Sequence, residues 1–210
     1  MLDQLKLSTR LAAGFGMVLL LLAVVAGVSS WQMRGLAGNT EAFAANIVPS
    51  LQLQKDIAMS LAAVRRWELR HVVSDSGAEM DAMEVEAAKE HKALTAAIAR
   101  YEKEMLVNDE DRRHLERTRA AVDAYLASWD KVRIASRRTA QDPSDKEAKA
   151  ALGLGMKVYQ AAQDEVDAWW DFNMQLSARA RRDAAATYAA AKLSTGALSL
   201  AALLIGVAAA

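Results

Sequence analysis

The segment LAAGFGMVLLLLAVVAGVSSWQM, from Leu11 to Met33, contains no charged side chain. About 20 apolar residues in a helix are enough to cross the hydrocarbon core of a bilayer. Trp31 lies near the end of the segment, and aromatic rings prefer the membrane interface. The segment therefore predicts a transmembrane helix over residues 11–33, preceded by a short N-terminus over residues 1–10.

A cleavable signal peptide is the alternative interpretation, because Lys6 and Arg10 form a basic start and small residues follow Ala26. Signal peptides usually have a shorter apolar core, of roughly 7–15 residues. A second charge-free segment, LSTGALSLAALLIGVAAA, covers residues 193–210 and also favours retention of the first. We expect residues 191–210 to begin a second transmembrane helix that is truncated where the sequence stops.

The orientation follows from the positive-inside rule. Lys6 and Arg10 lie directly before the first apolar segment, which places residues 1–10 in the cytoplasm. Residues 34–190 between the two apolar segments are then expected outside the cytoplasm.

Composition limits what the intervening region can do. Residues 35–188 hold 22 of the 26 basic and 25 of the 26 acidic side chains, a net charge of −3, which gives no reason to expect nucleic-acid binding. The absence of Cys from the sequence removes disulfides, thiol catalysis and cysteine metal sites. Only two Pro occur, and the abundance of Ala, Leu, Glu, Lys and Arg favours long helices.

Three polar breaks divide this region into four helices. The breaks are SDSG over 74–77, VNDED over 107–111 and AQDPSD over 140–145. Pro49 is expected to kink the first helix, and Ser144 with Glu147 predicts a capping box at the start of the fourth. Short turns make neighbouring helices antiparallel. The prediction is an all-α, antiparallel up-down four-helix bundle flanked by two transmembrane helices.

Apolar residues recur at steps of three and four in each predicted helix, which indicates the faces that pack inward. The expected core positions are Phe43, Ile47, Leu51, Ala58, Leu61, Val72, Met80, Met83, Ala87, Leu94, Ile98, Leu115, Val122, Leu126, Trp129, Met156, Val166, Trp170 and Leu176.

This layout resembles the N-terminal sensor region of bacterial methyl-accepting chemotaxis receptors. The opening LKLSTRLAAGFGMVLLLLAVVAGVSS, the segment NIVPSLQLQKDIAMSLAAVRRWELRHVV over 46–73, and the ending YAAAKLSTGALSLAALLIG carry the resemblance. It implies a non-enzymatic receptor for chemotaxis in the bacterial inner membrane, with a periplasmic ligand-binding domain over 34–190. It also implies a symmetric homodimer in which the fourth helix transmits the signal inward.

Six residues are candidates for binding the ligand. Arg66 and Arg70 are four residues apart and share a helix face, as in a carboxylate clamp. Arginines and a tyrosine from the other helices lie at a similar distance from the predicted distal turns. The full candidate set is Arg65, Arg66, Arg70, Arg133, Arg137 and Tyr159. Such a set suits a small di- or tricarboxylate, although each arginine could instead be paired with Glu68, Asp130 or other acids.

Comparison with the aspartate receptors of that family narrows the ligand. Arg66 and Arg70 match their R-x-x-x-R pair, but Leu61 stands where they carry another Arg. They also carry a Thr near the start of the fourth helix, whereas no Thr occurs here between Thr139 and Thr187. We therefore expect an organic acid without an amino group rather than aspartate.

No pattern for catalysis, a cofactor or a metal stands out. The spacing Glu68-x-x-His71 is that of di-iron bundles, but such sites need a second copy and further glutamates. Gly153 and Gly155 form a G-x-G with no preceding strand, so they either loosen the fourth helix or let another helix approach.

Two other functions remain open at the level of sequence. The same sensor could be the input of a histidine kinase or a diguanylate cyclase, and only the sequence beyond Ala210 would tell these from a chemoreceptor. A helical membrane adaptor without a ligand is the third alternative.

Overall fold

The computed structural model describes residues 7–142, 144 and 146–209, and they form helices with no strand among them. The elements are α1 (Leu7–Ala42), the π-helix η2 (Phe43–Ile47), α2 (Val48–Val73), α3 (Gly77–Glu104), α4 (Asp109–Gln141) and α5 (Glu147–Ala209). The predicted all-α class is confirmed. Two compact units divide the described residues, 45–176 in one and 7–44 with 177–209 in the other.

The smaller unit pairs the two apolar segments. Gln32 on α1 donates its side-chain amide to Ser194 Oγ at 2.6 Å and accepts from Thr195 Oγ1 at 2.8 Å, both on α5. A Cβ on Gly206 would lie 3.9 Å from a methyl carbon of Val18, so the same two helices also approach closely at a small residue. Small residues and interhelical polar bonds are the usual contacts between helices in membranes.

Two helices of the described chain are long and apolar enough to cross a membrane. One stretch is Gly14–Gly38, with a mean hydropathy of 2.0, and the other lies within Glu147–Val207, with a mean hydropathy of 1.6. Large side chains such as Leu20, Leu22 and Leu203 are exposed on these helices, as expected for surfaces that face lipid.

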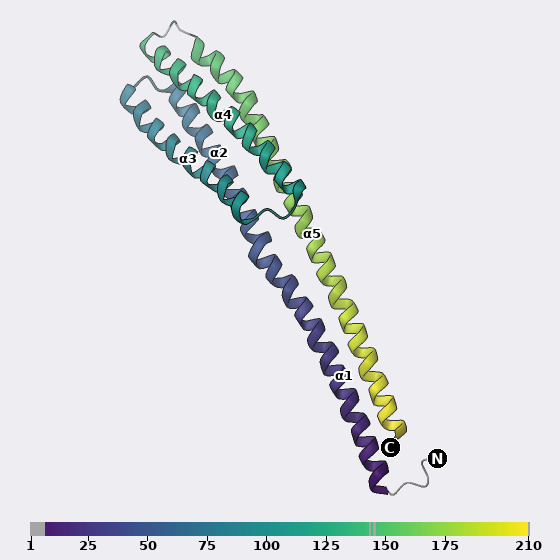
Figure 1. Ribbon diagram of the computed structural model, residues 1–210. Coiled ribbons are helices and arrows are strands. Elements are labelled where there is room, and N and C mark those ends of the chain that lie inside the picture. Colours follow the sequence, from purple (N-terminus) through teal and green to yellow (C-terminus); the bar gives the residue numbers. More distant parts are fainter. Residues whose placement is uncertain (1–6, 143, 145, 210) are drawn as a thin grey trace. The chain divides into compact units, whose positions relative to one another are not determined.

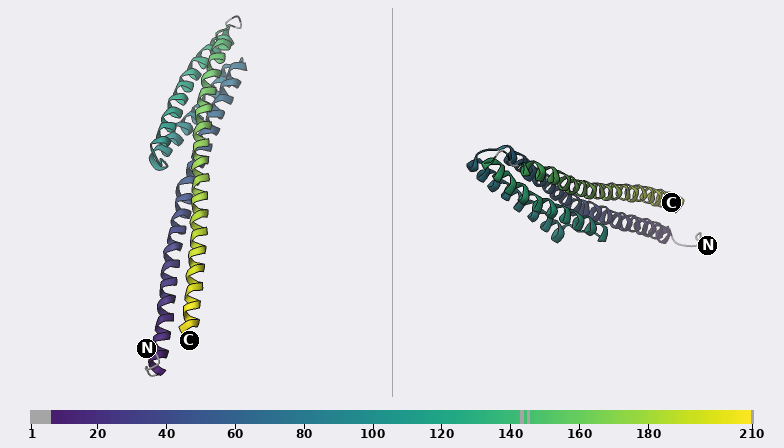
Figure 2. Two further views of the ribbon diagram at one scale, coloured as in Figure 1. Left: turned by 90° about the vertical axis from the view of Figure 1, so that its right-hand side faces the viewer. Right: turned by 90° about the horizontal axis from the view of Figure 1, so that it is seen from above.

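The larger unit is a four-helix bundle (Figure 1). It contains α2, α3, α4 and the first part of α5, which lie side by side in the views of Figures 1 and 2. The turn from α2 to α3 lies at one end of the bundle with the end of α4 and the start of α5, and the turn from α3 to α4 lies at the other end (Figure 1). This is the up-down arrangement predicted from the three breaks.

At two of these breaks a polar side chain caps the helix that follows. Ser76 accepts a hydrogen bond from the backbone N–H of Glu79 at the start of α3, and Asn108 accepts one from Asp111 at the start of α4. The capping box predicted at Ser144 is wrong. The Ser144 hydroxyl donates to Asp142 at 2.7 Å, and α5 begins three residues later, at Glu147.

Pro49 marks a local change of helix type rather than a break. Proline has no N–H to donate to the carbonyl four residues before it. The five residues 43–47 immediately before α2 form a π-helix, in which hydrogen bonds span one residue more than in an α-helix.

The core of the bundle follows most of the predicted faces. Leu61, Met80, Ala87, Leu94, Ile98, Leu115, Val122, Leu126, Trp129 and Val166 are buried. The prediction for Met156 is wrong, since its side chain is 60% exposed. Trp169 is fully buried, whereas its neighbour Trp170 is only half-buried. The buried face predicted for the fourth helix is therefore off by one residue at this point. The side chain of Phe43 lies outside the described ones.

One buried polar group fixes the α3–α4 end of the bundle. Asp111 is fully buried and accepts hydrogen bonds from the Tyr101 hydroxyl at 3.1 Å, the Trp169 indole at 2.7 Å and the backbone N–H of Val107 at 3.2 Å. Burial and the Asp111 carboxylate raise the pKa of Tyr101 far above its ordinary value, so the hydroxyl stays protonated and donates. Side chains from α3 and α5 thereby converge on the first turn of α4.

Candidate functional site

The first cluster of polar side chains lies inside the bundle, among α2, α4 and α5. Glu68 is fully buried, and its Oε2 accepts hydrogen bonds of 2.7 Å from the Arg65 guanidinium and from the Tyr125 hydroxyl. The Arg65 guanidinium lies 5.4 Å from the centre of the Tyr159 ring, and the Tyr125 and Tyr159 rings pack edge to face at 5.3 Å. Burial and Glu68 raise the pKa of Tyr125, so it remains a donor.

The other oxygen of Glu68 meets the backbone of α5. Glu68 Oε1 is buried and has no hydrogen-bond partner among the residues that the structure describes. A Cβ built on Gly155 would lie 3.1 Å from this oxygen and 3.1 Å from Ser128 Oγ. Gly155 therefore lets α5 approach the buried carboxylate, which agrees with one of the two roles expected for the glycine pair, whereas Gly153 faces open space.

The second cluster joins α2, α3 and α4. His71 is fully buried, with Nδ1 at 3.0 Å from Ser136 Oγ and Nε2 at 3.0 Å from Glu84 Oε1. Glu84 also accepts from Arg137 Nε at 2.6 Å and from an Arg133 nitrogen at 3.2 Å. Burial opposes ionisation of Glu84, but its hydrogen bonds with Arg137 and His71 lower its pKa overall, so it is a carboxylate.

Both arginines of this cluster have a second acidic partner. Arg137 bonds Asp81 of α3 at 2.5 Å, and Arg133 bonds Asp130 of its own helix at 3.4 Å. The hydrogen bonds that Arg137 donates to Glu84 and Asp81 raise its pKa, so it remains a cation.

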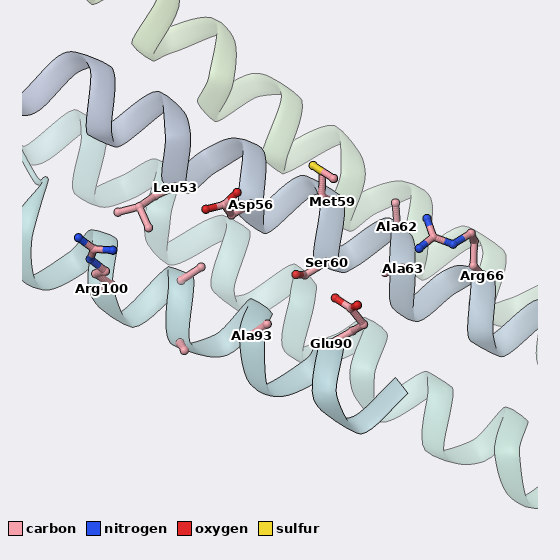
Figure 3. Close-up of a pocket in the computed structure, with 12 residues that line it drawn as sticks. Leu53, Asp56, Met59, Ser60, Ala62, Ala63, Arg66, Glu90, Ala93 and Arg100 are labelled. Carbon is pink, nitrogen blue, oxygen red and sulfur yellow. The ribbon is translucent and has the colours of Figure 1, made fainter. Parts of the chain in front are cut away.

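The third feature is a groove of about 580 Å³ between α2 and α3 (Figure 3). Small and apolar residues line most of it, namely Leu53, Met59, Ser60, Ala62, Ala63, Ala93, Ala96 and Ala97. Arg66 and Glu90 lie toward one end, and Arg100 lies at the other (Figure 3). Within the described part of the chain, no carboxylate lies within ion-pair distance of Arg66, whereas Arg100 is paired with Glu104 at 2.9 Å.

The six candidate residues therefore fall into four places. Arg65 and Tyr159 come together in the core, and Arg133 and Arg137 come together on Glu84. Arg66 lies in the α2–α3 groove, and Arg70 is exposed with its guanidinium 4.9 Å from the Trp67 ring. The pairing with acids that the sequence left open is confirmed for Arg65, Arg133 and Arg137.

Sequence reasoning gave no role to Glu84, Ser136 or Gly155's partner Ser128, and it treated His71 only as part of a metal motif. The pair Glu68 and His71 lies one helical turn apart and is fully buried on both members. Polar side chains on the apolar face of a helix need hydrogen-bond partners inside the protein. The presence of Glu68 and His71 on that face of α2 was therefore the sequence signal that could have indicated the buried clusters. The pair does not converge, because Glu68 bonds Arg65 and Tyr125 while His71 bonds Ser136 and Glu84.

The sequence of the chain matches one known family. Residues 4–188 match the family described as a four helix bundle sensory module for signal transduction. The chain belongs to this family. The match covers the bundle and the first apolar helix, and it confirms the resemblance to the sensor region of chemotaxis receptors. No curated protein and no solved structure matches the chain.

Membership of the family gives the buried clusters a context. In a sensory module the helices must hold a defined packing and also shift between packings when a signal is bound. Buried polar clusters satisfy their partners fully in only a few arrangements, so they specify the packing of neighbouring helices. In this module they join α2 to α4 through Glu68, and α2 to α3 and α4 through His71 and Glu84.

Proposed function

We propose that this sensory module is the input part of a transmembrane chemotaxis receptor that detects a small organic acid. The observation that carries the proposal is the match to a signal-transduction sensory module over residues 4–188, together with apolar helices before and after the bundle. The basic residues Lys6 and Arg10 favour a cytoplasmic N-terminus, which would put the bundle in the periplasm of a bacterial inner membrane.

The α2–α3 groove is the best place for the ligand. Arg66 is the one candidate arginine that both lines a groove and has no ion-pair partner among the described residues. A guanidinium can hold a carboxylate through two parallel hydrogen bonds, and such bonds to a charged group are stronger than neutral ones. Arg70 lies four residues further on the same helix and is exposed, so it can contact a second carboxylate.

The other candidate residues then have a supporting role. A ligand carboxylate would have to displace Glu68 from Arg65, or Glu84 from Arg133 and Arg137. For the buried Arg65–Glu68 pair, removing one partner leaves an uncompensated charge, which costs about 3–5 kcal/mol. We propose that Arg65, Arg133, Arg137 and Tyr159 hold the helices that shape the groove.

A second face of α2 supports a homodimer. Residues 48, 52, 55, 59, 62, 66, 69 and 73 follow steps of three and four along α2, apart from its core face. Among them Val48, Met59, Leu69 and Val73 are large, apolar and 43–83% exposed. A repeat of 3.5 residues is the spacing with which one helix packs along another in a coiled coil. We propose that this α2 seam packs against the α2 seam of a second copy, so that Met59, Ala62 and Arg66 belong both to the seam and to the lining of the groove.

Helix α5 is the proposed output. It is one helix from Glu147 to Ala209, and it contains both Trp169 of the bundle core and the second apolar segment. Packed helices shift in small discrete steps, and a ligand favours the arrangement that it binds more tightly. A shift of α5 would pass the signal to a cytoplasmic domain.

Calorimetric titration of the chain in lipid nanodiscs with citrate, malate, succinate, aspartate and serine tests this proposal. We expect heat with at least one organic acid, and binding weaker by at least about tenfold in Arg66→Ala. Arg113→Ala removes an exposed arginine from α4, outside the groove, and is the matched control that keeps the affinity. Heat from none of the acids would reject the ligand class, and equal affinity in both variants would reject the groove.

A further inference from the structure

His71 is the one buried histidine of the bundle, and nothing in the proposed ligand site uses it. It lies near the end of α2 and contacts two other helices. Its ring meets Ser136 of α4 through Nδ1 and Glu84 of α3 through Nε2, and it packs edge to face on Trp129 at 5.3 Å. A single side chain therefore joins three of the four helices.

The hydrogen bonds around His71 are complete in two protonation states. Glu84 can only accept, so the neutral ring must carry its proton on Nε2, and Nδ1 then accepts from the Ser136 hydroxyl. Ser136 Oγ also lies 3.0 Å from the backbone carbonyl of His71. When the ring gains a second proton, Nδ1–H donates to Ser136 Oγ, and the hydroxyl turns to donate to that carbonyl. Rotation of this hydroxyl is enough to keep both ring nitrogens hydrogen-bonded after the second proton is added.

We propose that His71 is a proton-binding site through which the bundle responds to the acidity outside the membrane. The ligand is a proton, delivered along Glu84, whose side chain is 20% exposed while that of His71 is fully buried. The site is independent of whether the module also binds an organic acid.

The charged groups around the ring set the direction of the response. Burial lowers the pKa of His71 below its ordinary value, the nearby cations Arg137 and Arg133 of α4 lower it further, and Glu84 of α3 opposes them. The charged groups with the largest effects on this pKa therefore lie on α3 and α4. The ring is therefore neutral at neutral pH, and it takes up its proton in more acidic solution than an ordinary histidine does.

Protonation changes which helices are tied together. The charged ring forms an ion pair with Glu84, which strengthens the link between α2 and α3. The same carboxylate holds Arg133, and the new positive charge competes for it. Arg133 has Asp130 as a second partner on its own helix, so it can leave Glu84, whereas the second partner of Arg137 is Asp81, again on α3. Acid thus weakens the Arg133 bridge between α3 and α4 and reshapes the small pocket that Arg133, Glu84 and Trp129 line.

The test is a pH titration of the histidine ring nitrogens by NMR, on the whole chain in nanodiscs labelled with ¹⁵N-histidine. The signals that disappear in His71→Gln identify the ring, and the exposed His91 is the internal control. We expect His71 to carry its proton on Nε2 at pH 7.5 and to titrate below pH 6.5. A ring that is protonated on Nδ1 at pH 7.5, or one that titrates above pH 6.5, would overturn the proposal.

Two neighbouring variants keep the proposal testable if His71→Gln does not fold, since the buried ring is then identified by its shift in them. Ser136→Ala leaves the Nδ1–H of the charged ring without an acceptor, so we expect a lower midpoint than in the wild type. Arg133→Gln removes a nearby positive charge, and we expect the midpoint to rise by about half a pH unit. A midpoint equal to that of the wild type in both variants would show that the ring does not titrate in this network, and would overturn the proposal.

Discussion

The carboxylate of Glu68 lies against the backbone of α5 at Gly155, where a Cβ would be 3.1 Å from Glu68 Oε1. Since Arg65 and Tyr125 hold the other oxygen of Glu68 at 2.7 Å, the carboxylate has little freedom to move away. The absence of a side chain at position 155 is therefore what allows α2 and α5 to pack at this point.

Substitution of the two glycines of α5 tests this packing. Gly→Ala in an open helix position stabilises a protein, by up to about 1 kcal/mol, and Gly153 has such a position. We expect Gly153→Ala to raise the urea midpoint and Gly155→Ala to lower it, because the new methyl group must displace Glu68 or Ser128. Urea midpoints that rise in both variants would mean that the close approach at Gly155 does not affect the stability of the bundle.

The buried ion pair makes a second prediction. Arg65→Met leaves the Glu68 carboxylate without its cation, and breaking a buried pair in this way costs about 3–5 kcal/mol. The double change Arg65→Met with Glu68→Leu removes both charges, so we expect it to recover most of the free energy of unfolding. The comparison needs urea unfolding of the single and double variants. A double variant that is as unstable as Arg65→Met would show that the pair itself, rather than the unpaired charge, supplies the stability.

Asp111 gives a third prediction, which concerns the end of the bundle where α3 turns into α4. Asp111→Leu leaves the buried Trp169 indole without its acceptor, and a buried unsatisfied donor costs about 1–3 kcal/mol, whereas the Tyr101 hydroxyl keeps Asn173 Oδ1 as an acceptor at 3.2 Å. We expect a clear loss of thermal stability, measured by circular dichroism. Asp109→Leu is the matched control, because Asp109 is exposed in the same first turn of α4 and contributes only through the helix dipole. Equal losses in the two variants would contradict the role given to Asp111.

The proposed dimer is directly testable because the sequence contains no cysteine. A single cysteine placed in the α2 seam, as Met59→Cys, is expected to form a disulfide between two copies under mild oxidation in membranes. Val85→Cys on α3 is the control, since Val85 has almost the same exposure, 57% against 58%, but lies outside the seam. Dimers on a non-reducing gel from Val85→Cys but not from Met59→Cys would place the interface elsewhere.

The sequence was sufficient to predict the helices and most of the core, because Pro, Gly and polar breaks and apolar spacing are local signals. Leu94, Leu115 and Val122 are fully buried as their spacing indicated. It failed at Met156, where Gly155 and not the methionine faces the core. A large apolar residue normally marks the buried face, but here that face holds the Glu68 carboxylate, and only a glycine leaves room for it.

The candidate site could be predicted less well, because its geometry depends on partners far apart in the sequence. The arginines were chosen because they lie at a similar distance from the predicted distal turns. That distance does not indicate which acidic side chains they contact. Arg137 and Arg133 meet Glu84, 53 and 49 residues earlier in the chain, and this pairing follows from how α3 packs on α4. That Arg66 lines a groove and has no ion-pair partner among the described residues can likewise be read only from the folded bundle.

The most direct measurement of the central claim is the output of a receptor that carries this module. Residues 1–210 would be joined to the cytoplasmic part of a chemoreceptor with a known kinase output, and kinase activity would be followed as citrate, malate and succinate are added. We expect at least one acid to change the activity in a dose-dependent way, with the response weakened by at least about tenfold in Arg66→Ala and retained in Arg113→Ala. A chimera with normal basal activity that responds to none of these acids would contradict the account.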